Sequence, residues 1–527
     1  MTATARRTLP NILVIMMDQL SAKALRQYGG HTARTPNLDR LAEEGTVFLN
    51  AYSNSPLCAP ARFLFMSGQL PSRIGAYDNA AEFHSETPTF AHYLRLRGYD
   101  TILSGKMHFI GADQLHGFES RLTTDIYPAD FGWTPDAEHP DKRFDWWMHN
   151  MLSVKQAGVA EYTNQLEFDD ETGHRAVQKL YDLARGGGSG RPFCLVTSFT
   201  HPHDPYAARR RYWDRYRPDE IEMPTVPAMP FEDLDPHSRR LYKAAATEQY
   251  DIGEDDVRNA RHAYFANIAY LDDWIGALLR TLEETGQMDR TAVLLTSDHG
   301  DMVGERGLWY KMSFFEWSAR VPLLLRLPGE GGGRVKTPVS LLDVLPTLLG
   351  IATDGREEDA LAAPLDGHSL LPLLSHEEER TVYGEYMGEG TVAPLIMIRR
   401  GRYKYVHCDA DPPQLFDLEG DPDELCNLAE DPACTEPASR FAREISDRWD
   451  LAALREAVIA SQHRRRLVSR ALMTGRQTPW DYEPPGDAAN RFMRNHLDLN
   501  EVEAKARFPV PPYPQPLRRD SESSTQD

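Results

Sequence analysis

Residues 11–19 read Asn-Ile-Leu-Val-Ile-Met-Met-Asp-Gln, an unbroken apolar run that ends at a carboxylate and an amide. An apolar run of this length is typical of a strand buried on both faces, as in parallel sheets covered by helices. Further strand-like runs occur at residues 100–104, 192–199 and 291–297, with helix-like segments between them. The pattern predicts an α/β fold with a large, mixed but mostly parallel sheet between layers of helices.

The ends of these predicted strands carry side chains that can take part in chemistry. They are Asp18, Lys106 with His108, His203, and Asp298 with His299. Ligands of open α/β sheets bind outside the carboxyl ends of the strands, so Asp18 is placed like a metal ligand. Alternatively, Asp18 could cap the following helix.

A second informative stretch is residues 55–68, Ser-Pro-Leu-Cys-Ala-Pro-Ala-Arg followed by Phe-Leu-Phe-Met-Ser-Gly. Proline fits the first turn of a helix, so a helix is expected to begin near Cys58 and Pro60. The free backbone donors of that turn, together with Arg62, favour an anion. A cysteine at a helix N-terminus usually has altered reactivity. The alternative is a loop cysteine beside a capped helix.

This stretch resembles the C-x-P-x-R signature of type I sulfatases, in which an activating enzyme oxidises the cysteine to formylglycine. Further resemblances are the Gly-Lys-x-His, Pro-His-x-Pro, Asp-His-Gly and Leu-Phe-Asp-Leu elements at residues 105–108, 202–205, 298–300 and 415–418. Met66 departs from the usual leucine. Gln19 stands where many sulfatases have a second acidic residue, which leaves its role as a metal ligand open.

The resemblance implies an alkaline-phosphatase-like fold and a hydrolase of sulfate esters. One hydroxyl of the hydrated formylglycine would attack sulfur, while His203 and Lys311 assist the leaving oxygen. His108 would then deprotonate the second hydroxyl, which releases sulfate and restores the aldehyde. Arg62 and Lys106 would hold the sulfate oxygens. The implied cofactor is a divalent cation, with calcium expected and magnesium or manganese as alternatives, held by Asp18, Cys58, Asp298 and His299.

Residues 75–80, 122–135, 388–394 and 493–496 resemble the choline sulfatases within this family. That resemblance implies choline O-sulfate as the substrate. A quaternary ammonium group has no proton to donate, so aromatic faces and carboxylates hold it. The expected substrate-binding residues are Asn79, Trp133, His149, Asn150, Glu389, with Glu385 as its substitute, and Asp498.

The composition restricts the other possible partners. The chain has 527 residues and a formal charge of −21, from 58 basic and 79 acidic side chains, which disfavours nucleic acid and anionic membranes. Five cysteines are too sparse for a disulfide framework. The sequence begins without a signal-peptide pattern and contains no apolar segment of membrane-spanning length, so we expect a soluble cytoplasmic protein.

We expect a catalytic domain at residues 1–378, a smaller α+β domain with an antiparallel sheet at 379–475, and an extended tail at 476–527. A single helix is expected at about residues 437–460 of the smaller domain. The resemblance implies that the tail reaches a neighbouring subunit of a homo-oligomer, a dimer of dimers, where Asp498 contacts the ammonium group. Alternatively, the tail packs on its own subunit.

A formylglycine-generating enzyme is the expected maturation partner.

Two other functions remain open. The first is a phosphonate monoester or phosphodiester hydrolase, or an arylsulfatase, of the same superfamily. The second is a non-catalytic protein that binds choline or sulfate, if Cys58 is never oxidised.

Overall fold

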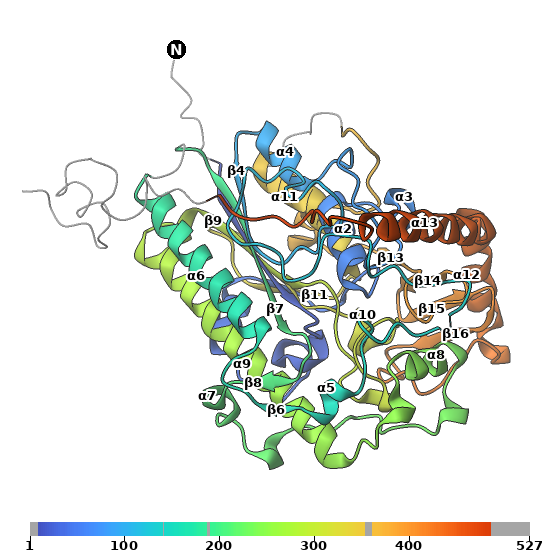
Figure 1. Ribbon diagram of the computed structural model, residues 1–527. Coiled ribbons are helices and arrows are strands. Elements are labelled where there is room, and N and C mark those ends of the chain that lie inside the picture. The colour runs from blue at the N-terminus through green and yellow to red at the C-terminus, as the bar shows by residue number, and fades with distance from the viewer. Residues whose placement is uncertain (1–8, 141, 187–189, 354–360, 486–527) are drawn as a thin grey trace, which may run out of the picture.

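The centre of the molecule is an eight-stranded sheet in the order β11-β2-β10-β9-β1-β7-β4-β5. The computed structural model describes residues 9–140, 142–186, 190–353 and 361–485 (Figure 1). The strands are β1 (Asn11–Asp18), β2 (Thr46–Phe48), β4 (Asp100–Gly105), β5 (Ser120–Arg121), β7 (Phe193–Pro202), β9 (Thr291–Ser297), β10 (Leu323–Arg326) and β11 (Gly333–Val335). β1 pairs in parallel with β7 and β9, whereas β10 runs antiparallel to β9 and β2. The predicted mixed, mostly parallel sheet is confirmed.

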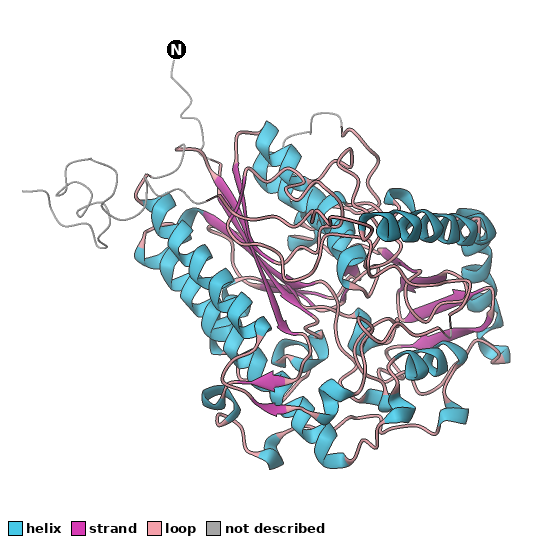
Figure 2. Ribbon diagram, in the orientation of Figure 1, coloured by secondary structure: helices cyan, strands magenta, loops and turns pink. Residues whose placement is uncertain are grey.

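Helices cover both faces of this sheet, which explains why β1 is apolar from Ile12 to Met17 (Figure 2). The side chains of Leu13 and Ile15 pack in the core that contains residues of α6 (Asn164–Ala184) and α9 (Glu254–Glu284). The alternate residues of β1 pack in a second core with three helices on the opposite face, α2 (Cys58–Ser67), α4 (Phe90–Leu96) and α11 (Val344–Thr353). Successive side chains of a strand point to opposite faces, so β1 contributes to both cores.

A separate four-stranded antiparallel sheet follows in the chain. It consists of β13 (Thr381–Tyr386), β14 (Leu395–Arg400), β15 (Tyr403–Cys408) and β16 (Asp411–Asp417), in this order. Its core includes Phe441 and Ile445 of α12 (Thr435–Arg448). The expected single helix at 437–460 is wrong, because α12 ends at Arg448 and α13 (Leu451–Leu472) begins anew. The Asp450 side chain caps α13 by accepting from the Ala453 N–H at 2.9 Å.

The cysteines and the helices of the described residues bear on the expectations about disulfide bonds and membrane spans. All five cysteines fall within the described residues and are free. In the described ranges, no helix combines the length and the apolar character needed to cross a membrane. α13 lies beside the loop that follows α3 (Pro71–Ile74), where Arg465 pairs with Asp78 (Figure 1).

Candidate active site

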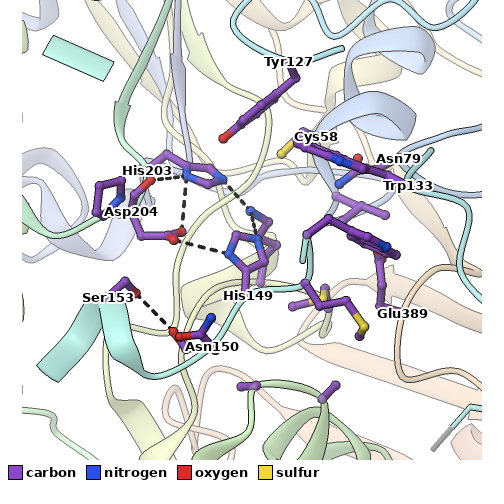
Figure 3. Close-up of a pocket in the computed structure, with 18 of the residues that line it drawn as sticks. Cys58, Asn79, Tyr127, Trp133, His149, Asn150, Ser153, His203, Asp204 and Glu389 are labelled. Carbon is purple, nitrogen blue, oxygen red and sulfur yellow. Dashed lines mark hydrogen bonds and ion pairs between the residues drawn. The ribbon is translucent and has the colours of Figure 1, made fainter. Parts of the chain in front are cut away.

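The chemically active side chains predicted from the sequence lie at the carboxyl ends of the strands of the large sheet. Asp18 is the last residue of β1, and Asp298 directly follows β9. Cys58 is the first residue of α2, so the unpaired backbone donors of that helix start at the same edge. A pocket of about 430 Å³ opens there, with Cys58 in its lining (Figure 3). The topology therefore gathers groups that are far apart in the sequence.

Four buried groups form a cluster of potential metal ligands, Asp18, Cys58, Asp298 and His299. Their ligand atoms all lie within 4.8 Å of one another. The Cys58 Sγ is 3.3 Å from His299 Nε2 and 3.9 Å from Asp18 Oδ1. His299 Nδ1 contacts the carbonyl oxygen of Gly300 at 2.9 Å, which leaves Nε2 for the cluster. Burial lowers the pKa of His299, so the ring is neutral, and two carboxylates with a neutral imidazole fit a divalent cation.

Buried cations lie against the same carboxylates. The Arg62 side chain donates from Nη2 to Asp18 Oδ2 at 2.9 Å and from Nε to Asp298 Oδ2 at 2.8 Å. Lys106 forms an ion pair with Asp18. Burial alone would raise the pKa of Asp18, but the charges of Lys106 and Arg62 hold it well below its usual range. Asp18 is therefore ionised, as a cation ligand must be.

Lys311 has three acceptors around its ammonium group. Its Nζ lies 2.6 Å from Gln19 Oε1, 2.8 Å from His203 Nε2 and 3.1 Å from His149 Nε2. Asp204 offers its backbone oxygen to His203 Nδ1 at 2.7 Å and its carboxylate to His149 Nδ1 at 3.3 Å (Figure 3). Each ring therefore carries its proton on Nδ1 and accepts at Nε2. Burial lowers the pKa of both histidines, which leaves Lys311 as the charged donor.

Gln19 connects this ammonium group to a buried acid. Its Nε2 donates to Asp301 Oδ2 at 2.6 Å while its Oε1 accepts from Lys311. The sequence left a metal-ligand role for Gln19 open. In the structure, its amide bridges Asp301 and Lys311, so its carboxamide oxygen faces a cation of the chain itself.

His108 is held by its backbone as well as by packing. Its φ of 55° lies in the left-handed region, and the N–H groups of Met107 and His108 both donate to Asp125 Oδ2 at 3.0 Å. The ring meets Trp133 edge-on at 5.7 Å and lies 5.1 Å from Tyr127. Burial lowers the pKa of His108, so the neutral ring is available to accept a proton.

Another part of the pocket is mainly aromatic. Trp133 stacks on Trp147 with 6.2 Å between ring centroids, and lies 4.9 Å from Tyr127. Trp146 is also in the lining, and 69% of its surface is exposed. The Glu389 carboxyl is buried in the same lining, and this burial raises its pKa to about 7. An apolar wall with one carboxyl group suits a cation that cannot donate hydrogen bonds.

Of the other predicted binding residues, some line the pocket and others do not. Asn79 and Asn150 line the pocket, and Asn79 Oδ1 accepts from the Ala59 N–H at 3.0 Å. Glu385 is outside the lining, because its carboxylate accepts from the backbone and hydroxyl of Ser72 and from the Trp449 indole, each at 2.7 Å. Asp498 lies outside the described residues.

Three residues of the site received no role from the sequence, namely Tyr127 and Asp204, which line the pocket, and Asp125, which holds the backbone of His108. Tyr127 covers the Lys106 ammonium at 4.3 Å from the ring centroid. Asp204 had a local signal, since it lies within the Pro-His-x-Pro element beside His203. Asp125 and Tyr127 belong to a segment with little regular structure, where sequence patterns do not indicate which side chains point inward.

Sequence comparisons place the chain among sulfatases. A profile of the sulfatase family matches residues 10–354, and one of the choline sulfatase C-terminal region matches residues 456–508. A profile of the C-terminal part of N-sulphoglucosamine sulphohydrolase matches residues 304–449. The choline-sulfatase of Rhizobium meliloti (strain 1021) is 53% identical over 508 residues, which cover 95% of this chain and 98% of that protein. Arylsulfatase K of Danio rerio is 30% identical over 470 residues, with 83% and 84% covered.

Two solved structures have the same fold. The phosphonate monoester hydrolase of Silicibacter pomeroyi superposes with a TM-score of 0.66 at 23% identity, with 83% of this chain and 94% of that chain covered. The phosphonate monoester hydrolase of Agrobacterium radiobacter gives 0.64 at 24% identity, with 85% and 96% covered. At these identities the likeness establishes the fold alone.

Proposed function

The chain belongs to the sulfatase family and is a sulfuric ester hydrolase, and from this premise we propose that its substrate is choline O-sulfate. The observation that carries the proposal is the division of one pocket into two parts. Cys58 and Lys311 line one part, and the buried cations Lys106 and Arg62 lie behind Cys58, as a sulfate ester requires. Trp133 and Glu389 belong to a part that suits a quaternary ammonium group. The 53% identical relative is a choline-sulfatase, which supports the same substrate.

Residue 58 is the proposed source of the nucleophile. A formylglycine-generating enzyme would oxidise Cys58, and the modified side chain supplies a hydrated aldehyde whose hydroxyl is the nucleophile. The side chain starts α2, and its Sγ position lies beside both His299 Nε2 and Asp18 Oδ1. The sulfate oxygens would be held by Lys106 and Arg62, which are fully buried and so act with little screening from water.

A divalent cation is proposed at the cluster of Asp18, Asp298, His299 and residue 58, with calcium as the first expectation and magnesium or manganese as alternatives. Such a cation neutralises charge on the sulfate group and lowers the pKa of a bound hydroxyl. Asp18 has Oδ1 toward Cys58 while Arg62 and Lys106 occupy Oδ2. The chain therefore offers one carboxylate oxygen to the cluster and keeps the other for its own cations.

Lys311 is the proposed donor to the leaving oxygen, and His203 assists it by accepting one of its hydrogens. Burial alone would lower the pKa of Lys311, but neighbouring carboxylates, Asp204 and Asp18, act in the opposite direction and the pKa is raised overall. Lys311 therefore remains protonated, and His203 Nε2 accepts one of its hydrogens. When Lys311 donates a proton to the leaving choline oxygen, it becomes a neutral amine that regains a proton from water, while His203 Nε2 keeps it in position. His108 is proposed to deprotonate residue 58 in the step that releases sulfate.

The proposed function extends to the ammonium-binding residues, the domain organisation and the location of the protein. The aromatic part of the pocket would hold the ammonium group through Trp133, with His149, Asn150, Asn79 and Glu389 around it. We propose domains at residues 1–378 and 379–475, and a tail at 476–527 that brings Asp498 to a neighbouring subunit of a dimer of dimers. The proposed location is the cytoplasm.

The test compares kcat/KM for choline O-sulfate and for a phenyl phosphonate ester, with protein produced together with a formylglycine-generating enzyme. We expect choline O-sulfate to be preferred, because only that substrate places a cation against Trp133 and Glu389. A preference for the phosphonate ester would instead indicate that the chain is a phosphonate monoester hydrolase. Binding without turnover, with Cys58 unmodified in the intact mass, would favour a binding protein.

A further inference from the structure

The C-terminal helix α13 reaches the pocket through a buried ion pair. Arg465 donates from Nη1 and Nη2 to the two carboxylate oxygens of Asp78, both at 2.7 Å. The Asp78 side chain is fully buried, and only 6% of the Arg465 side chain is exposed. A buried pair contributes little net stability compared with apolar packing, whereas a bidentate pair fixes the relative position of two segments.

The two segments that Arg465 joins both carry pocket residues. Asp78 precedes Asn79, whose Oδ1 accepts from the N–H of Ala59, the neighbour of Cys58. Arg465 Nη1 also donates to Thr134 Oγ1 at 3.2 Å. Thr134 follows Trp133, which lies in the lining beside Tyr127 and Trp147. One guanidinium group therefore connects the wall with Asn79 to the wall with Trp133.

Neighbouring side chains on α13 support the same connection. Ser461 Oγ accepts from Arg465 Nε at 3.2 Å, one helical turn away. Gln462 Oε1 accepts from the Ala137 N–H at 2.8 Å, and its Nε2 lies 3.4 Å from Asp78 Oδ2. Arg466 donates to the carbonyl oxygen of Pro135. This face of α13 thus contacts both loops, at residues 78–80 and at residues 134–137.

We propose that Arg465 is a positioning residue that sets the width of the choline-binding part of the pocket, by tying the Asp78 loop to the Thr134 loop. The inference rests on the proposed function, since it assigns Trp133 to the ammonium group. Arg465 touches neither substrate nor residue 58, so it acts through Asn79 and Trp133. It also gives a role to the segment matched by the choline sulfatase C-terminal profile, which includes this residue.

The test measures KM and kcat of Arg465→Met and Arg465→Lys on choline O-sulfate and on a neutral aryl sulfate. Arg464→Met is the matched control, because Arg464 is the adjacent arginine and is exposed. For Arg465→Met we expect KM for choline O-sulfate to rise about tenfold, equivalent to the loss of roughly 1.4 kcal/mol, while kcat and both aryl sulfate parameters change less than about threefold. Arg465→Lys keeps the charge without the bidentate geometry, so its KM should be intermediate.

Thermal melting first establishes that each variant is folded. If Arg465→Met is unfolded, the KM of Arg465→Lys is used for the test instead. An unchanged KM for choline O-sulfate in a folded variant would overturn the inference. So would an equal loss on both substrates, because that is the result of a purely structural role. A parent protein that turns over aryl sulfate but not choline O-sulfate would instead overturn the proposed function, and the positioning role with it.

Discussion

The two parts of the pocket are built in opposite ways. The part around Cys58 takes its groups from the ends of buried strands and the start of a helix, and Asp18, Asp298 and His299 have no exposed surface. The aromatic part takes Trp133 and Trp146 from the irregular segment that directly follows β5, and Trp146 is 69% exposed. The sheet thus fixes the groups for chemistry, while loops that the sheet does not constrain supply the groups for recognition.

This difference has an energetic side. Around Cys58, charged side chains are completely dehydrated and compensate one another at 2.8 to 2.9 Å, as in the contacts of Arg62 with Asp298 and Asp18. Removing one partner leaves a buried charge without compensation, which is costly. In the aromatic part, contacts are between ring faces and depend less on exact distance. We therefore expect substitutions to have larger effects around Cys58 than around Trp133.

Among the substitutions that compare the two parts of the pocket, the largest effect is expected for Asp298→Ala. This change removes a proposed metal ligand and leaves the Arg62 guanidinium partly unpaired, so kcat should fall by about a thousandfold. Elemental analysis of the same preparation should show reduced metal content. Asp289→Ala, at an exposed aspartate before β9, is the control and should change neither quantity. Full activity and full metal content in Asp298→Ala would show that the cluster is not a metal site.

A smaller effect, confined to one substrate, is expected for Trp133→Leu. Loss of the cation–π contact should raise KM for choline O-sulfate by roughly tenfold, with little change for a neutral aryl sulfate. Trp146→Leu, at the exposed edge of the same lining, should have a weaker effect. Equal losses on the charged and the neutral substrate would mean that Trp133 supports the pocket rather than the ammonium group.

The smallest effect concerns pH and Glu389. Burial raises the pKa of Glu389 to about 7, so the carboxyl is charged above that pH and neutral below it. Its attraction for an ammonium group is therefore present at high pH and lost as the pH falls through 7. KM for choline O-sulfate should rise severalfold between pH 8 and pH 6, since only about a tenth of the carboxyl is ionised one unit below its pKa.

Glu389→Gln is the matched variant, because it keeps the size and removes the charge. Its KM should be higher at pH 8 and should lose the pH-dependent rise. The role of Glu389 is contradicted if the glutamine variant follows the same pH profile as the parent.

The sequence indicated the sheet and most of the Cys58 region because both leave local patterns. A strand buried on both faces is a continuous apolar run, so Asp18 and Asp298 could be located by counting to the strand ends. The helix boundary at Asp450 was missed, since an apolar periodicity continues through it and only the capping side chain marks the new start.

The contacts that complete the site could not be predicted, because they join residues that are distant in the chain. Arg465 and Asp78 are 387 positions apart, and Lys311 and Gln19 are 292 apart. No local pattern indicates either partner. The same holds for Glu385, which was considered for the ammonium group but is bound to Ser72 and Trp449. Side chains of loops without periodicity, such as Tyr127, give no signal of which way they point.

The most direct test of a nucleophile derived from Cys58 relates turnover to the chemical state of residue 58. Preparations with different degrees of activation are analysed by peptide mass for the fraction of oxidised residue 58, and kcat for choline O-sulfate is measured on each. We predict that kcat is proportional to that fraction, that the line passes through the origin, and that Cys58→Ala is folded but inactive. Undiminished turnover of choline O-sulfate by protein whose Cys58 is unmodified, or by Cys58→Ala, would contradict the account.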